Sequence, residues 1–134
     1  GLLGARLADA DFTNAVFDMA DLGKSDASNG VFDGTSMTDA FMNNMDLSGA
    51  SFRGADLAGV DLKDAVLHGT DLSQSRLSSA LIHEATFVRC NLTEADLRGS
   101  ELNLSRFTEC NWQGTLTGEE PKDDDDDDLP DTDA

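Results

Sequence analysis

Two cysteines, two histidines and many carboxylates are the side chains of this sequence that could do chemistry. Cys90 and Cys110 are separated by twenty positions and could form a disulfide or contribute to a metal site. His68 and His83 could act as general bases or as metal ligands. Whether any of these groups meet depends on the backbone that carries them, and that backbone has a distinctive period.

A large apolar residue recurs at every fifth position from Leu2 to Trp112. Of the twenty-three positions in this register, twelve are Leu, six Phe, two Met, one Ile and one Trp, and the only small one is Ala27. We call this position the centre of each five-residue unit. The period matches neither the roughly 3.6 residues of an α-helix nor the roughly 2 residues of a β-strand. A register that continues without interruption from Leu2 to Trp112 indicates a repeat architecture.

The other positions of the unit are also characteristic. The position two before the centre is small, and eleven of its twenty-two occurrences from Ala5 to Cys110 are Ala. The position just before the centre is often Asp or Asn, and the two after it are polar or Gly. Extended backbone points residues two apart to the same side, and Gly, Asn, Asp and Ser favour tight turns. Each unit therefore predicts a short straight segment, with its small and large residues facing inward, and then a corner.

The units ADLAG, VDLKD, TDLSQ, CNLTE and ADLRG begin at residues 55, 60, 70, 90 and 95 and resemble the A(D/N)LXX pattern of the pentapeptide-repeat family. The resemblance covers residues 1 to about 117. It implies an all-β fold, a right-handed quadrilateral parallel β-helix with four units to a coil and nearly six coils. We therefore predict a pentapeptide-repeat β-helix over 1–117 and an acidic disordered tail over 118–134.

Residues that are four units apart should stack in such a coil, and this predicts the core. One column of centres contains Phe12, Phe32, Phe52, Leu72, Leu92 and Trp112. Although an aromatic ladder can resemble a ligand-stacking surface, inward-facing centres favour an interior packing ladder. Trp112 is the last large centre, since Thr117 is polar. We expect Trp112 to close the core, as the ends of solenoids require.

Cys90 and Cys110 both occupy the small inward position. Stacked in register, their Cα atoms would be about 4.8 Å apart, within the disulfide range. Parallel in-register side chains fit the disulfide dihedral angle poorly, so two buried thiols acting as small apolar fillers are the favoured interpretation. A zinc site is not expected, because no further Cys or His completes four ligands.

The histidines and carboxylates do not form a catalytic pattern. His68 and His83 each follow a centre, so they should point outward from different sides of the coil. Asp61 and Asp64 are close in sequence, but the repeat itself predicts surface aspartates. No nucleophile accompanies a positioned base, and no insertion forms a cleft for a substrate. We predict that the protein is not an enzyme and has no catalytic residue, cofactor or metal.

The sequence contains 27 acidic and nine basic residues, a net charge of −18. This balance argues against direct nucleic-acid binding and against adhesion to an anionic membrane. No apolar run approaches the roughly 18 residues of a membrane span, so membrane insertion is not expected. Half of the net charge, −9, lies in residues 118–134, which include six consecutive Asp. The 17 acids and eight bases of residues 1–117 form no continuous acidic stripe along any predicted side.

The resemblance also implies an activity, since the best-known members of the family are quinolone-resistance proteins that bind DNA gyrase as mimics of duplex DNA. An acidic rod permits such mimicry, but the scattered charge does not favour it. We predict a non-enzymatic rigid scaffold that binds a protein partner of unknown identity, in transient contacts or as a subunit of a larger assembly. A DNA-mimicking binder of a topoisomerase or another DNA-binding protein is the alternative.

Outward apolar residues indicate where a partner binds, because the outward positions should be polar. Four of them share the side of the coil that carries Leu22, and these are Leu3, Phe41, Leu81 and Leu104. Phe41 and Leu81 occupy one column, two coils apart, in alternation with acidic residues. A docking strip is one interpretation of this column, and tolerance of single apolar surface residues is the other.

The sequence begins within a repeat at Gly1 and has no initiator Met, so we expect a processed or truncated N-terminus. An open first coil would then be available for end-to-end contact. The stretch ADFTNAVFDMADL, residues 10–22, is similar to members of the family from the thylakoid lumen. The chloroplast thylakoid lumen and the bacterial cytoplasm are therefore the two candidate compartments.

Overall fold

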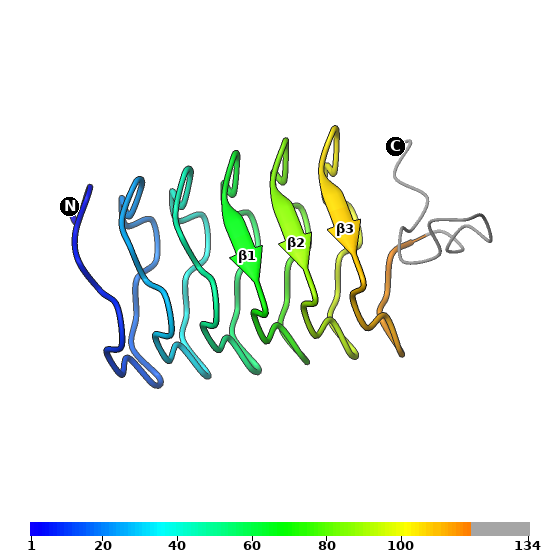
Figure 1. Cartoon of the computed structure of the whole chain (residues 1–134), viewed down its shortest axis with the longest axis horizontal. Coiled ribbons are helices and arrows are strands. Elements are labelled where there is room, and N and C mark those ends of the chain that lie inside the picture. Colours follow the sequence, from blue (N-terminus) through cyan, green and yellow to red (C-terminus); the bar gives the residue numbers. More distant parts are fainter. Residues whose placement is uncertain (119–134) are drawn as a thin grey trace.

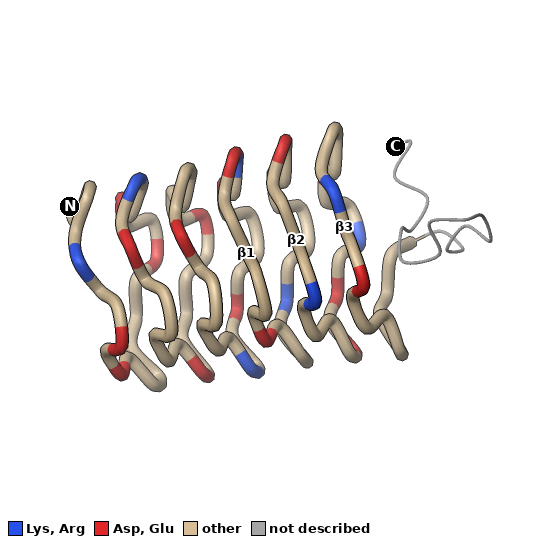
Figure 2. Tube along the Cα trace, in the orientation of Figure 1, with Lys and Arg blue, Asp and Glu red and all other residues tan. Residues whose placement is uncertain are grey.

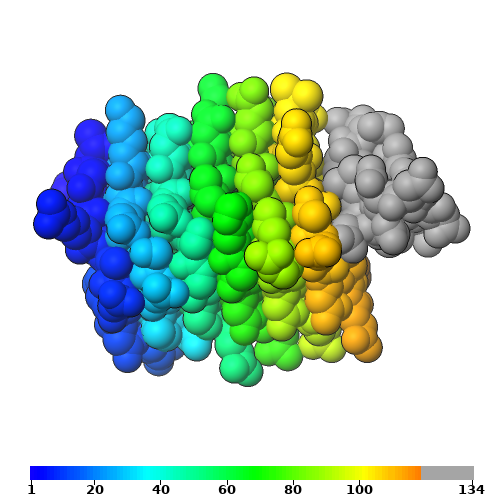
Figure 3. Space-filling view, viewed as in Figure 1, coloured from blue at the N-terminus to red at the C-terminus, as the bar shows by residue number. Residues whose placement is uncertain are grey.

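The computed structural model describes residues 1–118, which form an elongated stack of coils (Figures 1 and 3). Three short strands lie side by side in the order β1 (Val66–His68), β2 (Thr86–Val88) and β3 (Arg106–Thr108). Both pairings are parallel, and Leu67, Phe87 and Phe107 lie in register across them. Within the described residues, no helix is long and apolar enough to cross a membrane. The residues of the predicted acidic tail from 119 onward lie outside the described part of the chain.

The same register holds around the rest of the coil. Isolated parallel bridges join Asp26 to Asp46, Ser51 to Asp71, and Arg76 to Asp96. Because four five-residue units separate the partners, each coil contains four units, and its backbone hydrogen-bonds to the coils on both sides. The all-β class and the parallel pairing expected from the repeat are confirmed.

Every corner of the rod shares one backbone feature. The residue two after each centre has a positive φ between 52° and 76°, from Gly4 to Gly114, whether or not it is Gly. At most corners the following N–H donates to the carbonyl of the centre, as Ala55 does to Phe52 at 3.1 Å. This left-handed region suits Gly, Asn and Asp, and other residues adopt it at a cost. The repeat therefore turns at a fixed position in each unit, which keeps the sides of successive coils in line.

The Asp or Asn before the centre stabilises the same corner. Its Oδ1 accepts the backbone N–H of the residue two positions later, as Asp61 does from Lys63 at 3.0 Å. Such turns are formed by Asp11, Asp21, Asp26, Asp46, Asp56, Asp61, Asp71, Asn91, Asp96 and Asn111. These side chains are the short polar type that bonds its own backbone in turns. Many of the acids on the rod therefore have a structural role.

The centres and the small residues fill the interior. Phe32, Phe52, Leu72 and Leu92 are at most 1% exposed. The Phe32 and Phe52 rings stack with centroids 4.8 Å apart and planes 7° from parallel, a favourable aromatic arrangement. Phe12 extends the stack, 5.2 Å from Phe32, but it is only partly buried in the first coil.

Trp112 ends the core by reaching across to another side of the coil. It is partly buried, and its ring lies 5.0 Å from Phe107 at an angle of 54°. Its indole Nε1 is buried and has no hydrogen-bond partner among the described residues. The last large centre thus packs on the side that carries β3, a contact that the column of stacked centres does not predict.

The space beside the small centre Ala27 is occupied by the ring of the next centre, Phe32. Ala27 is completely buried, and Phe32 lies against the neighbouring Gly30. A Cβ at Gly30 would lie 2.8 Å from Cε2 of Phe32 and 3.1 Å from the carbonyl oxygen of Ala27. The absence of a side chain at Gly30 therefore allows the Phe32 ring to occupy this space.

Candidate docking face

Acidic and apolar side chains alternate in a single column on one side of the rod. Parallel bridges order its members as Asp21, Phe41, Asp61, Leu81 and Glu101. We call these five residues the alternating column. Each precedes a buried centre, so its side chain faces outward, and neighbouring members are one coil apart, about 4.8 Å along the rod.

The two apolar members of the alternating column are exposed. Phe41 is 51% exposed and Leu81 is 38% exposed. Between them, Asp61 is half-buried, and Asp21 and Glu101 at the two ends are exposed. Single exposed apolar side chains are common on protein surfaces, so the feature that distinguishes Phe41 and Leu81 is their alignment in one column.

The carboxylates of the column keep hydrogen-bonding capacity for a partner. Oδ1 of Asp21 accepts the N–H of Gly23 at 3.1 Å, and Asp61 forms the corresponding turn described above. Glu101 uses Oε1 for a contact of 3.0 Å with Nε2 of His83. The second oxygen of each carboxylate makes no hydrogen bond within residues 1–118. Three acceptors therefore lie along the column beside the two apolar groups.

The other two predicted docking residues lie outside this column. Leu3 is 62% exposed and follows the centre of the first unit, whereas Leu104 is 78% exposed and occupies a corner with φ of 60°. They are in coils at opposite ends of the described rod. The structure thus aligns Phe41 with Leu81 and separates Leu3 and Leu104 from them.

Exposed apolar residues also occur in the first coil, where the sequence interpretation did not select them. Val16 is 72% exposed and Met19 is 71% exposed, and both belong to the unit centred on Phe17. Met19 could have been recognised from the sequence as an exposed apolar residue, because most residues two after a centre are polar or Gly. These two side chains lie beside the predicted end-to-end contact surface, which stays a prediction.

The histidines are not part of a larger assembly of reactive groups. His68, at the end of β1, is exposed, and His83 contacts Glu101. In the part of the chain that the structure describes, no group of three or more His, Cys, Asp or Glu residues is placed to hold a metal ion. Among the described residues, His83 therefore has one carboxylate neighbour, and neither imidazole lies in a cluster that could hold a metal ion.

Cys90 and Cys110 are buried and are thiols rather than a disulfide. Sγ of Cys90 donates to the carbonyl of Leu67 at 2.9 Å, and Sγ of Cys110 lies 3.6 Å from the carbonyl of Phe87. The contact with Cys110 and burial raise the pKa of the Cys90 thiol. Since the thiolate is the reactive form, Cys90 is expected to be inert in the folded rod.

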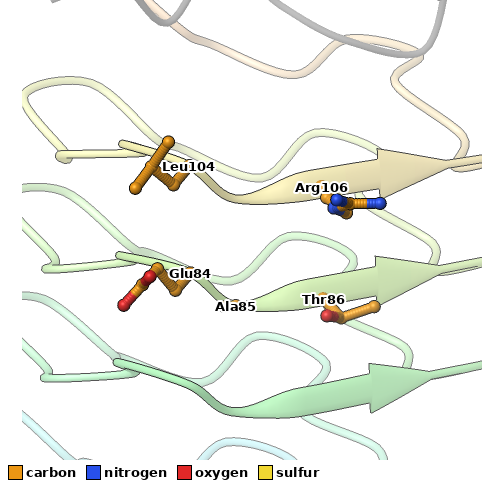
Figure 4. Close-up of a pocket in the computed structure, with 5 residues that line it drawn as sticks. All are labelled: Glu84, Ala85, Thr86, Leu104 and Arg106. Carbon is orange, nitrogen blue, oxygen red and sulfur yellow. The ribbon is translucent and has the colours of Figure 1, made fainter.

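An open hollow of about 340 Å³ lies at a corner near the C-terminal end of the described rod. It is lined by Glu84, Ala85, Thr86, Leu104 and Arg106. Figure 4 shows the lining residues on two neighbouring coils, with Leu104 next to Glu84 and Arg106 next to Thr86. The hollow contains a carboxylate, a hydroxyl and a guanidinium, but no ion pair joins Glu84 to Arg106. It lacks a nucleophile with a positioned base.

Most of the arginines pair with acids. Figure 2 shows basic residues interspersed with acidic ones along the rod. Arg76 lies 3.2 Å from Asp56, and Arg98 lies 2.9 Å from Asp96. The hydrogen bond from Arg98 lowers the pKa of Asp96. Longer pairs join Arg53 to Asp71 at 4.0 Å and Arg89 to Glu109 at 3.5 Å. By contrast, the alternating column contains no base, although Lys24 and Lys63 lie on the same side.

Parallel coils, repeated polar turns and an exposed alternating column define a β-solenoid whose outer faces are available for contact. A family model for pentapeptide repeats matches the sequence in eight copies, over residues 2–29, 20–54, 31–64, 46–82 and 75–114. The chain belongs to the pentapeptide-repeat family. No curated protein matches the sequence.

Three solved structures are similar to this chain. Rfr23, a pentapeptide repeat protein from the cyanobacterium Cyanothece 51142, is 28% identical, with a TM-score of 0.47, over 61% of this chain and 56% of Rfr23. The pentapeptide repeat protein alr5209 from Nostoc PCC 7120 is 29% identical, with a TM-score of 0.44, over 85% of this chain and 81% of alr5209. QnrB1, a plasmid-mediated fluoroquinolone resistance protein, is 17% identical, with a TM-score of 0.34, over 89% of this chain and 80% of QnrB1. The chain therefore spans little more than half the length of Rfr23.

Proposed function

We propose that this chain is a non-enzymatic protein-interaction module, a right-handed quadrilateral β-helix of nearly six coils that docks a partner on the alternating column. The observation that carries the proposal is the exposure of Phe41 and Leu81, 51% and 38%, in one column between carboxylates. Aromatic side chains such as that of Phe41 are enriched at protein–protein interfaces. Either predicted compartment, the chloroplast thylakoid lumen or the bacterial cytoplasm, is compatible with this function.

The backbone around the column supports the proposal because it holds the anchors at a set spacing. The N–H of Phe41 donates to the carbonyl of Ala20 at 2.8 Å, and the N–H of Leu81 donates to the carbonyl of Val60 at 2.8 Å. The centre that follows Phe41, Met42, is completely buried. A surface whose geometry is formed in advance loses little conformational entropy when it binds.

The test is affinity capture with the full chain and with the Phe41→Asp and Leu81→Asp variants as matched baits. Val66→Asp is the control, because Val66 also precedes a centre and is 36% exposed, but it lies in β1 on another side. We expect a partner to be retained by the unchanged chain and by Val66→Asp and lost from both column variants. Equal capture by all four baits would show that the column is not the docking site.

DNA mimicry toward a topoisomerase is the second candidate function, and it is supported by the 17 acids against eight bases in residues 1–117. The arginine–carboxylate pairs weaken it, because they interrupt the array of negative charge. A gyrase supercoiling assay at two salt concentrations, with the full chain and with residues 1–117, tests it. Inhibition by both proteins that weakens with salt would support mimicry, and the absence of inhibition would contradict it.

A further inference from the structure

We infer that the partner segment of the alternating column is a basic amphipathic α-helix that lies along the axis of the rod. The inference rests on the proposed function, because it names the occupant of the same column.

The spacing of the column fits a helix. Its members are one coil apart, so Phe41 and Leu81 are separated by about 10 Å, with Asp61 midway at about 5 Å. A helix rises about 1.5 Å per residue, which puts positions i and i+7 about 10.5 Å apart on one face, and positions i+3 and i+4 about 4.5–6 Å from the first. A helix parallel to the rod therefore presents one turn to each coil.

The charge of the column specifies the polar residues of that helix. Apolar side chains at i and i+7 contact Phe41 and Leu81, and Lys or Arg at i+3 or i+4 faces the second oxygen of Asp61. Bases one turn beyond each end, at i−4 and i+11, face Asp21 and Glu101. Such charge-assisted hydrogen bonds are stronger than neutral ones. The whole side has five acids and two bases, Lys24 and Lys63, so its net charge of −3 also attracts a basic segment.

An extended partner fits the same surface poorly. The same-face residues of a strand recur about every 6.8 Å, which matches neither the step between coils nor the distance between the two anchors. Strand addition also needs a free edge. Here the N–H of Phe41 donates to Ala20, and its carbonyl accepts the N–H of Leu22 at 2.7 Å. Both main-chain groups of Phe41 are therefore already paired with a neighbouring coil, and they are not available to an added strand.

The helix has a limited length. Its pitch of about 5.4 Å exceeds the coil spacing of about 4.8 Å, so the two repeats drift apart by about 0.6 Å per coil. Over the four steps from Asp21 to Glu101 the drift is about 2.4 Å, which long Lys and Arg side chains can absorb. We expect a partner segment of about four turns, or roughly 15 residues.

The probe for this inference is a labelled helical peptide of about 18 residues with Leu at i and i+7, Arg at i−4, i+3, i+4 and i+11, and Ala and Gln elsewhere. Binding to the full chain is measured by fluorescence anisotropy. We expect Phe41→Asp and Leu81→Asp each to weaken binding by at least about tenfold, and Val66→Asp to leave it unchanged. Lys63→Gln should strengthen binding, because it removes a base next to Asp61. Equal affinity for Phe41→Asp and the unchanged chain would overturn the inference.

Two control peptides separate the helical face from charge and from the proposed function. One has the same composition with the second Leu moved to i+9, on the opposite face, and the other alternates apolar and basic residues as a strand does. If the first control peptide bound as tightly as the designed peptide, the interaction would be charge attraction alone, and the inference would be overturned. Tighter binding of the second, sensitive to Phe41→Asp, would overturn the helix and leave the docking column standing. The proposed function itself is tested by the affinity capture. It would be overturned if the Phe41→Asp and Leu81→Asp baits retained the partner as well as the unchanged chain does.

Discussion

Oδ1 of Asp18 accepts the backbone N–H of Thr38, one coil later in the chain, at 2.9 Å. The same oxygen accepts the hydroxyl of Ser36 at 2.6 Å. Asp33 repeats the arrangement with Ser51 and Arg53. An aspartate directly after a centre thus joins two coils, whereas an aspartate directly before a centre closes its own turn. Position within the unit therefore decides whether a carboxylate stabilises a corner or the contact between coils.

The hydrogen bonds of Asp18 predict that the folding stability of the chain depends on pH. The hydrogen bonds from Ser36 and Thr38 lower the pKa of Asp18 in the folded chain. Because the folded pKa is the lower one, the stabilisation is present above the unfolded pKa and is lost as the pH falls through the folded value. Asp18→Asn should lower the melting temperature at pH about 7, and the difference from the unchanged chain should shrink toward pH about 2.

Asp64→Asn is the matched control for this measurement, because the Asp64 side chain makes no hydrogen bond within the described residues. Asn also tolerates its φ of 60°. Circular dichroism melting curves at several pH values give both comparisons. A difference between Asp18→Asn and the unchanged chain that does not vary with pH would contradict the prediction.

Gly30→Ala should destabilise the rod by about 1–3 kcal/mol. The new Cβ would lie 2.8 Å from the Phe32 ring in a closely packed interior. Gly23→Ala is the control, since its Cβ would lie 2.9 Å from Oδ1 of Asn43, the end of a side chain that can rotate away. Urea unfolding gives both free energies, and equal losses would contradict the packing of Phe32 over Gly30.

Leu104→Asn should stabilise the chain by up to about 1 kcal/mol. Leu104 has a φ of 60° and is 78% exposed, so the change relieves backbone strain and removes little packing. Leu116→Asn is the control, because Leu116 is 47% exposed and does not have a positive φ. Thermal melting measures both variants. A loss of stability for Leu104→Asn would contradict the prediction. It would show that the packing of Leu104 beside Glu84 contributes more than the relief of backbone strain.

The two cysteines should react with a thiol reagent only after unfolding. Both are buried, and the raised pKa of Cys90 keeps its thiol protonated in the folded chain. An increase from pH about 7 to about 9 should therefore speed labelling of the urea-unfolded chain and leave the folded chain unlabelled. Fast labelling under native conditions would show that the small inward column is open to solvent.

Phe41→Asp should change the free energy of unfolding by less than about 0.5 kcal/mol, because Phe41 faces outward. Phe52→Ala, in the stacked interior column, should cost about 3–5 kcal/mol. Urea unfolding of the two variants compares an outward aromatic with an inward one. A large loss for Phe41→Asp would place this residue in the core and remove it from the docking face.

Much of the architecture follows from the sequence, because inward and outward positions alternate within each unit and the register has no insertion. The burial of Phe32 and Phe52 and the burial of Cys90 and Cys110 could be expected from this pattern. Parallel pairing at a shift of four units was expected only from the resemblance to the pentapeptide-repeat family, because a period of five does not fix the number of sides. The pattern also predicts that Phe41 and Leu81 face outward, and the coil of four units implied by the resemblance places them in one column. These properties depend only on the position of a residue in the repeat.

Only the tertiary structure decided which neighbours those residues meet. It placed Trp112 against Phe107, set the Phe32 ring over Gly30 and joined Asp18 to Thr38. Each of these contacts depends on side-chain rotamers and on units that lie on different sides or in different coils. A one-dimensional repeat assigns the same environment to all equivalent positions. Close packing makes their environments differ, since each space is filled by whichever neighbouring side chain can reach it.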